Sequence, residues 1–195
     1  MQALLRELRT AILMTVALAL LVCGAYPVLV YALAQGFFPT QANGSIIFHQ
    51  GTAVGSSLLG QPFSSPRYFH PRPSAGGYDG TASGGTNLGP TSKQLMEDVR
   101  ERVNRYRQMN SLPGDTPVPA DAATASASGL DPHISVENAL LQAPRVATVR
   151  GWKPDDVAAI VRQYMEGRTF GIFGEPRVNV LLLNLALDEK EKSGT

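Results

Sequence analysis

The chain has 195 residues, with 17 lysines and arginines, 16 aspartates and glutamates, and a formal net charge of +1. This balance, without a basic stripe, argues against nucleic-acid binding. The single cysteine, Cys23, lies inside an apolar run, which excludes a disulfide, zinc–thiolate or thiol-catalytic site elsewhere in the chain. About 160 residues remain outside that run, enough for one compact domain.

The apolar run from Ala11 to Ala34 contains no charged residue. As a helix it would be about 36 Å long, which exceeds the roughly 30 Å hydrocarbon layer of a bilayer. We therefore predict one transmembrane helix over residues 11–34. A cleaved signal peptide is the alternative, because Ala32-Leu33-Ala34 fits a cleavage site, but signal cores span only about 7–15 residues.

The charges that flank this run predict its orientation. Arg6 and Arg9 precede it, whereas the next lysine or arginine after it is Arg67. By the positive-inside rule, residues 1–10 are cytoplasmic and residues 35–195 form an extracytoplasmic domain. We therefore predict a single-pass membrane protein with its N-terminus in the cytoplasm.

Three residues within the predicted span suggest a contact with another helix. Pro27 has no backbone N–H, so it frees the Cys23 carbonyl and favours a kink, and Gly24 and Ala25 form a small-residue face beside it. Small residues commonly mark helix-packing surfaces in membranes. A proline tolerated in a lone anchor is the alternative.

The first part of the domain alternates short apolar segments with turns. A short strand is predicted around Ile46 and Phe48, and residues 55–63 are expected to form a second apolar element. Residues 66–90 are rich in glycine, proline and serine and predict an irregular segment, whose aromatic residues favour an ordered, packed structure. A helix follows over 93–109, capped by Thr91 and Gln94, with a charged, solvated outer face.

The second part is predicted to contain two helices and a strand. Residues 110–129 have the composition of a surface linker. Ser135 caps a helix that Pro144 should kink or divide, and another helix begins at Pro154. Residues 177–187, RVNVLLLNLAL, are expected to form a mostly buried strand. The predicted fold is a single N-terminal transmembrane helix followed by one mixed α/β (α+β) extracytoplasmic domain.

Motifs for catalysis and ligand binding are incomplete. The glycines of residues 83–93, SGGTNLGPTSK, lack the ending of a phosphate-binding loop. Ser126 or Ser128 with Asp131 and His133 could form a serine triad on paper, but a turn at Pro132 that caps the next helix is the preferred interpretation.

Histidine and arginine side chains offer no clearer site. The three histidines, His49, His70 and His133, lack metal-ligand spacing. Arg72 and Arg177, each beside proline, could recognise a carboxylate, although an internal salt bridge is the more common role.

Six segments in order carry a family resemblance. They are QANGS (41–45), GSSLLGQPF (55–63), YFHPRPSA (68–75), SGGTNLGPTS (83–92), SGLDPHIS (128–135) and GEPRVNVLLLNLALD (174–188). Together they resemble the C subunit of the bacterial Kdp potassium-transporting ATPase over nearly the whole chain. Thr86 stands where serine is expected and Ala127 where glycine is expected, which affects local loop geometry.

The resemblance implies a non-catalytic subunit in a high-affinity, ATP-driven potassium import pump of the bacterial inner membrane. Its partners would be the channel-like A subunit, the P-type ATPase B subunit and the small F subunit, besides the lipid bilayer. ATP, magnesium and potassium would be used by those subunits, and no cofactor would bind this chain directly. The subunit would assemble and stabilise the complex and raise the ATP affinity of the B subunit, for which Gln142 is the candidate residue.

The predicted topology implies that any effect of this chain on the ATP affinity of the B subunit is indirect. ATP is cytosolic, whereas the domain is predicted on the other side of the membrane. The candidate partner-interface residues are Gly24, Ala25, Pro27, His70, Arg72, Asn87, Asp131, His133 and Arg177. Two alternatives stay open: a membrane-anchored extracytoplasmic hydrolase that uses Ser128, Asp131 and His133, and a potassium-binding gate over the outer channel mouth.

Overall fold

The computed structural model describes residues 1–193, which form two compact units divided between Ile46 and Ile47. The first unit is dominated by one helix from Gln2 to Phe37, whose most apolar window has a mean hydropathy of 2.3 and contains no buried residue. Its segments are α1 (Gln2–Ala19), a π-helical turn η1 (Leu20–Ala25) and α2 (Tyr26–Phe37), followed by the short α3 (Pro39–Ala42).

The π-helical turn lies directly before Pro27. The Tyr26 N–H bonds to the Leu21 carbonyl five residues back, which is the π-helical pattern. Because Pro27 cannot donate to the carbonyl of Cys23, the backbone hydrogen bonds rearrange in this turn. The helix therefore continues through the proline without interruption, with a widened turn beside it.

A hairpin opens the second part of the chain. β1 (Ile46–His49) and β2 (Thr52–Ser56) form a two-stranded sheet. The short strand predicted around Ile46 and Phe48 is confirmed as β1. Only Gln50 and Gly51 connect them, with φ angles of 51° and 78°. Two consecutive positive φ values are typical of tight hairpin turns, and glycine adopts them without strain.

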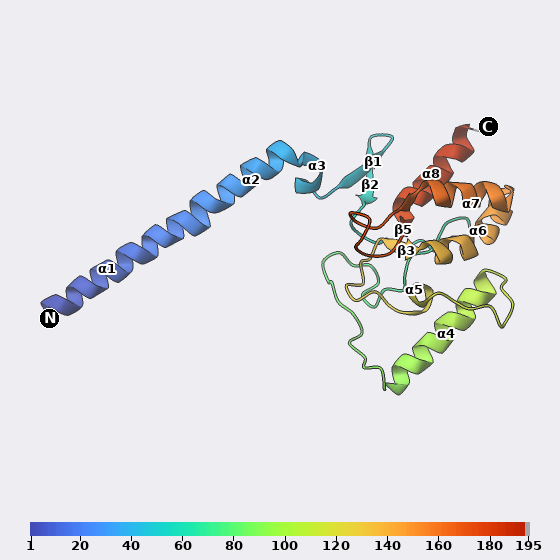
Figure 1. Ribbon diagram of the computed structural model, residues 1–195, viewed down its shortest axis with the longest axis horizontal. Coiled ribbons are helices and arrows are strands. Elements are labelled where there is room, and N and C mark those ends of the chain that lie inside the picture. Colours follow the sequence, from blue (N-terminus) through green and yellow to red (C-terminus); the bar gives the residue numbers. More distant parts are fainter. Residues whose placement is uncertain (194–195) are drawn as a thin grey trace. The chain divides into compact units, whose positions relative to one another are not determined.

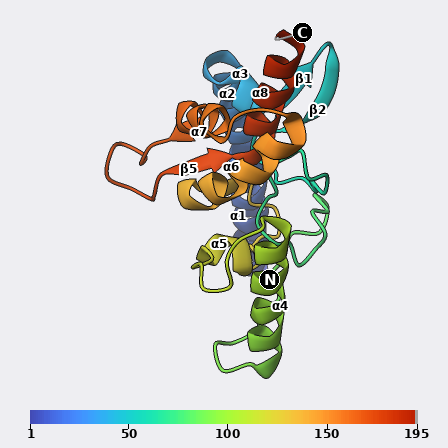
Figure 2. The ribbon, with the colours of Figure 1, turned by 90° about the vertical axis from the view of Figure 1, so that its right-hand side faces the viewer.

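The core of the second unit forms where three helices meet a small sheet. The antiparallel order is β3 (His133–Ser135), β5 (Arg177–Asn179), β4 (Met165–Glu166). In both views α6 (Val136–Arg150), α7 (Pro154–Gln163) and α8 (Val180–Ser193) gather around β5, and α4 (Lys93–Met109) lies away from them (Figures 1 and 2). Phe69, Val146, Val161, Val178 and Leu183 fill this core. The mixed helix and strand content of the domain is thus confirmed.

The predicted strand over 177–187 is wrong beyond its first three residues. The strand ends at Asn179, and α8 begins at Val180. The buried residues Val180, Leu183, Asn184 and Leu187 have i, i+3, i+4, i+7 spacing, which is the pattern of one helix face. The Asn179 side chain accepts a hydrogen bond of 3.2 Å from the Leu182 N–H and so supports the first turn of the helix.

The other predicted helices are present, with small differences at their ends. Ser92, rather than Thr91, caps α4 through the Leu95 N–H. Ser135 caps α6 as predicted, at 3.1 Å from the Asn138 N–H. Pro144 lies inside α6 and does not divide it.

The connection over 110–129 is more deeply packed than a surface linker. It contains the short helix α5 (Ala120–Ala123), and Ala122, Ala123 and Ser126 are buried. Asp121 accepts hydrogen bonds from the Ser135 N–H at 2.7 Å and from the Asn138 side chain at 3.0 Å. The small alanine side chains allow α5 to pack closely against the domain. A composition rich in proline and alanine does not by itself predict this packing.

Candidate functional site

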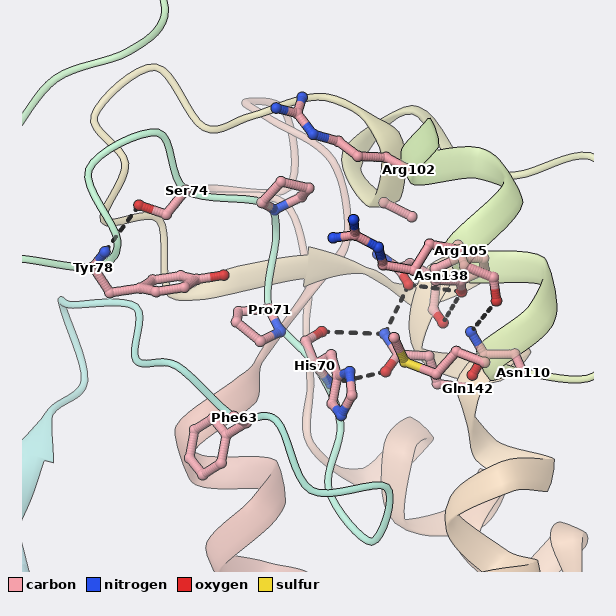
Figure 3. Close-up of a pocket in the computed structure, with 14 residues that line it drawn as sticks. Phe63, His70, Pro71, Ser74, Tyr78, Arg102, Arg105, Asn110, Asn138 and Gln142 are labelled. Atoms are coloured by element: carbon pink, nitrogen blue, oxygen red, sulfur yellow. Dashed lines mark hydrogen bonds between the residues drawn. The ribbon is translucent and has the colours of Figure 1, made fainter. Parts of the chain in front are cut away.

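Two carboxamide side chains hold the irregular segment that contains Phe69 and His70. Gln142 of α6 accepts a hydrogen bond from the His70 N–H at 2.8 Å and donates one to the His70 carbonyl at 3.1 Å (Figure 3). Asn184 of α8 makes the same pair of bonds with Phe69, at 2.8 and 3.0 Å. Each carboxamide thus satisfies both the N–H and the C=O of one residue in this irregular segment.

A network of buried polar groups extends from Gln142. Its amide also donates to Asn138 Oδ1 at 2.8 Å, and Tyr106 of α4 donates to the same oxygen at 2.8 Å. Arg145 donates to Gln142 Oε1 at 2.9 Å and to the Tyr68 carbonyl at 3.0 Å. Burial raises the pKa of Tyr106 and lowers that of Arg145 to about 10.

A pocket of about 430 Å³ lies between α4 and this segment (Figure 3). Its wall combines apolar and aromatic groups with arginines, among them Phe63, Tyr78, Arg102 and Arg105. Gln142 lines the pocket, yet it is only 1% exposed and both N–H groups of its amide are already donated within the protein. In this arrangement the Gln142 amide has no N–H left for a ligand.

A second cluster, of charged side chains, connects the C-terminal end of α6 to α8 through ion pairs. The Arg150 side chain, 1% exposed, forms ion pairs of 2.7 Å with both Asp188 and Glu191. It also donates to the Arg67 carbonyl at 2.9 Å, and its guanidinium lies 5.2 Å from the centre of the Tyr68 ring. A buried cation with two ion pairs and a backbone hydrogen bond has a structural role, because removing it would leave groups in the interior without their main partner.

Four of the predicted interface residues lie in one chain of charged contacts, which we call the ion-pair chain. Arg72 binds Asp131 at 2.8 Å, and Arg177 binds Glu166 at 3.0 Å across the β4–β5 pair. His133 lies between them, with ring nitrogens 3.7 Å from the Asp131 carboxylate and 3.4 Å from that of Glu166. The internal salt bridges expected for Arg72 and Arg177 are thus confirmed.

The pKa of Asp131 in the ion-pair chain is lowered from its ordinary value. Burial by itself would raise its pKa, but hydrogen bonds from His133 and Arg72 outweigh that effect and hold the pKa at about 2. The Asp131 carboxylate also accepts from the His133 N–H at 2.9 Å, which fixes the turn at Pro132. The turn is as predicted, whereas the cap of the following helix comes from Ser135.

This lowered pKa predicts a pH dependence of stability. Because the folded protein binds the Asp131 proton more weakly than the unfolded chain, the stabilisation is present above the ordinary pKa of 3.8 and is lost as the pH falls toward about 2. Asp131→Asn should lower the free energy of unfolding by about 1 kcal/mol at neutral pH, after allowance for solvent screening. Urea titrations from pH 7 downward should show this difference disappear; a difference unchanged at acid pH would contradict it.

The remaining candidate residues lie in other places. Asn87 is exposed in an irregular segment, with a φ of 53° that asparagine tolerates. Gly24 and Pro27 belong to the apolar helix, and Ala25 lines an apolar groove there with Leu21, Val22, Tyr26 and Leu29. The interface residues predicted from sequence therefore form no single site.

The serine triad is not formed. The Ser128 hydroxyl accepts from the Leu130 N–H at 3.1 Å and lies 3.2 Å from the Ser126 hydroxyl. His133 faces Asp131 and Glu166 instead. Ser128 is held in its own turn, and the geometry does not support the hydrolase hypothesis.

Comparison with known proteins agrees with this arrangement of an apolar helix and a compact mixed domain. A family model described as KdpC, K+-transporting ATPase, c chain, matches residues 8–189. The chain belongs to the KdpC family. It is therefore a subunit of a potassium-transporting ATPase complex.

Three relatives illustrate the similarity, and each is described as a potassium-transporting ATPase KdpC subunit. That of Nitratidesulfovibrio vulgaris is 50% identical over 188 residues, covering 95% of both chains. That of Mycobacterium bovis is 48% identical over 185 residues, covering 94% of this chain and 98% of the relative. That of Rhodospirillum rubrum is 50% identical over 190 residues, covering 96% and 97%.

Several residues that organise these clusters were not singled out from the sequence. Asn184, Arg145, Arg150 and Glu166 owe their roles to partners far away along the chain. Asn184 alone left a signal, as a lone polar residue at helical spacing within an apolar run. That spacing is visible only when residues 180–193 are taken as a helix.

Proposed function

We propose that this KdpC-family chain is a non-catalytic subunit that assembles and stabilises a P-type potassium import pump. Its partners would be the A, B and F subunits, which would use the ATP, magnesium and potassium. In this proposal the helix crosses the inner membrane, residues 1–10 are cytoplasmic, and residues 35–195 form the extracytoplasmic domain. Arg6 and Arg9 before the apolar run support this orientation. Protease added to intact spheroplasts tests this orientation: an extracytoplasmic domain should be cleaved, and a protected domain would contradict it.

The observation that carries the proposal is the unpartnered state of the apolar helix. No residue of α1, η1 or α2 is buried within this chain. At the π-helical turn, Ala25 and its apolar neighbours line a groove of about 530 Å³. Small residues in a membrane helix allow close packing of a second helix, so this groove suits a transmembrane helix of a partner subunit.

An effect of this chain on ATP affinity would be indirect. The candidate Gln142 is buried, and its amide N–H groups bind His70 and Asn138. A nucleotide could reach them only after the segment around His70 is released. The proposed route is therefore through the position of the membrane helix in the complex rather than through nucleotide contact.

Filling the helix groove should weaken the complex. Ala25→Leu adds a branched side chain to the groove and should lower the yield of co-purified partner subunits several-fold, because close helix packing is lost. Ala19→Leu makes the same change on the same helix outside the groove lining and should leave the yield unchanged. Equal yields for both variants and the unmodified chain would contradict the docking proposal. Circular dichroism should show that the domain stays folded.

A further inference from the structure

One backbone carbonyl of the apolar helix lacks its main-chain donor. In an α-helical turn the Val22 carbonyl accepts from the N–H four residues on, and in a π-helical turn from the N–H five residues on. The N–H four residues on is that of Tyr26, and it bonds to the Leu21 carbonyl instead. The residue five positions on is Pro27, which has no N–H. The turn η1 therefore leaves the Val22 oxygen unpaired, although the helix runs without a break from α1 into α2 (Figure 1).

The neighbouring side chains of the helix do not replace this donor. Residues 16–30 contain no serine, threonine, asparagine or glutamine, whose side chains commonly bond to backbone groups inside membrane helices. Cys23 carries only a weakly donating thiol, and the Tyr26 hydroxyl lies at the far end of an exposed ring. The helix by itself therefore leaves the Val22 oxygen unsatisfied.

Val22 lies at the middle of the uncharged run from Ala11 to Ala34. At 1.5 Å per residue, about 17 Å of helix separates it from either end of that run. In the proposed orientation across the bilayer, lipid tails surround this position, and water and headgroups are at the two ends of the run. Hydrocarbon supplies no hydrogen-bond donor, so an unpaired carbonyl at this depth needs a donor from protein.

The groove on the apolar helix lies on the face where this carbonyl opens. Four of the residues that line it, Val22, Ala25, Tyr26 and Leu29, have the i, i+3, i+4, i+7 spacing of one helix face. A helix carbonyl points toward the C-terminal end, and therefore toward the residues three and four positions on, here Ala25 and Tyr26. Because Ala25 has only a methyl group and the adjacent Gly24 has no side chain, a second helix can approach the Val22 oxygen closely.

We propose that a transmembrane helix of a partner subunit fills this groove and donates a hydrogen bond from a hydroxyl or carboxamide side chain to the Val22 carbonyl. This rests on the proposed function, in which the groove receives a partner helix. The partner helix presents an apolar face with one serine, threonine, asparagine or glutamine at the level of Val22. A lipid tail would fill the groove but leave the oxygen unpaired, so a helix with one donor matches both features.

Infrared spectroscopy of a single labelled carbonyl tests this contact. The chain has one cysteine, so Val22→Cys combined with Cys23→Val moves it to position 22, where ¹³C-carbonyl cysteine labels that carbonyl alone. The matched control is Leu13→Cys combined with Cys23→Leu, which labels a carbonyl in the regular part of α1. Valine and cysteine are similar in size, so the exchanged chain should assemble as the unmodified chain does.

In phosphatidylethanolamine–phosphatidylglycerol vesicles that contain this chain alone, the amide I band of position 22 should lie at a higher wavenumber than that of position 13, because its carbonyl accepts no hydrogen bond. In the complex assembled with unlabelled A, B and F subunits, the band of position 22 should move to a lower wavenumber and that of position 13 should not move. Pro27→Ala restores the missing N–H, so it should lower the band of position 22 in the chain alone.

Equal bands for positions 22 and 13 in the chain alone would overturn the proposal, because water, this chain or a second copy of it would then supply the donor. A band of position 22 that stays high in the assembled complex would also overturn it: the groove would face lipid or a wholly apolar helix, and the proposed subunit role would stand. An unmodified chain that does not co-purify with the other subunits would contradict the proposed function itself.

Discussion

Arg150→Met should lower the free energy of unfolding of the domain by about 3 kcal/mol, one of the two largest effects expected in this chain. The substitution keeps most of the apolar stem but removes a buried cation that pairs with Asp188 and Glu191 at 2.7 Å. Asp188 would keep its hydrogen bond from Tyr68 and Glu191 its ion pair with Arg67, but both would lose the Arg150 guanidinium, and the Arg67 carbonyl would lose its donor. Removal of one partner from a buried pair costs more than the pair contributes, because the other charge stays behind.

Urea denaturation of the domain beginning at Ile47 measures this effect. Trp152, the single tryptophan, lies 5.7 Å from the Arg150 guanidinium and gives a local fluorescence signal. Arg105→Met is the matched control. Arg105 pairs with Glu101 on the exposed face of α4, so this substitution should change the free energy of unfolding by at most about 0.5 kcal/mol. Similar losses for both variants would refute a special role for Arg150.

Gln142→Leu should lower the free energy of unfolding by about 3 kcal/mol, because it removes both hydrogen bonds to the half-buried N–H and carbonyl of His70 and the bond to the buried Asn138 side chain. Leucine has nearly the same volume, so the loss reports the hydrogen bonds rather than a cavity. Gln94→Leu on the exposed start of α4 is the matched control and should be nearly neutral. Thermal and urea unfolding of the domain measure both variants.

The same variant separates a structural role of Gln142 from a nucleotide role. In the assembled pump, at a temperature at which the variant domain is still folded, the KM for ATP should be unchanged. A raised KM for ATP in a folded, fully assembled variant would instead assign Gln142 a part in nucleotide affinity. The control variant Gln94→Leu shows whether assembly itself was affected.

Much of the local structure follows from residue patterns. The charged outer face of α4 has the predicted i to i+4 pairs, Lys93–Glu97 and Asp98–Arg102 among them. α7 begins at Pro154, with Val157, Ile160 and Val161 buried, as their helical spacing indicates. These predictions succeed because caps, prolines and apolar periodicity act within a few residues of one another.

The error over residues 177–187 has a physical cause. A continuous apolar run is compatible with either a buried strand or a buried helix, because its residues show no polar positions that would reveal a period of 2 or of 3.6. Here tertiary packing decides: β5 needs only three residues to bridge β3 and β4, and the rest must cover the core as a helix. Asn184 then reaches Phe69, 115 residues away along the chain.

The sequence by itself determined the apolar helix, its basic flank, most of the helices and the resemblance that the family comparison confirmed. Each of these depends on composition, short-range spacing or the order of motifs. Only the tertiary structure decided which carboxylates Arg72 and Arg177 bind, that Gln142 and Asn184 hold the segment around Phe69, and that Phe170 stands exposed on a loop. Hydrogen bonds and ion pairs between distant segments form only where the folded backbone brings those segments together. Local residue patterns do not predict which distant segments become neighbours.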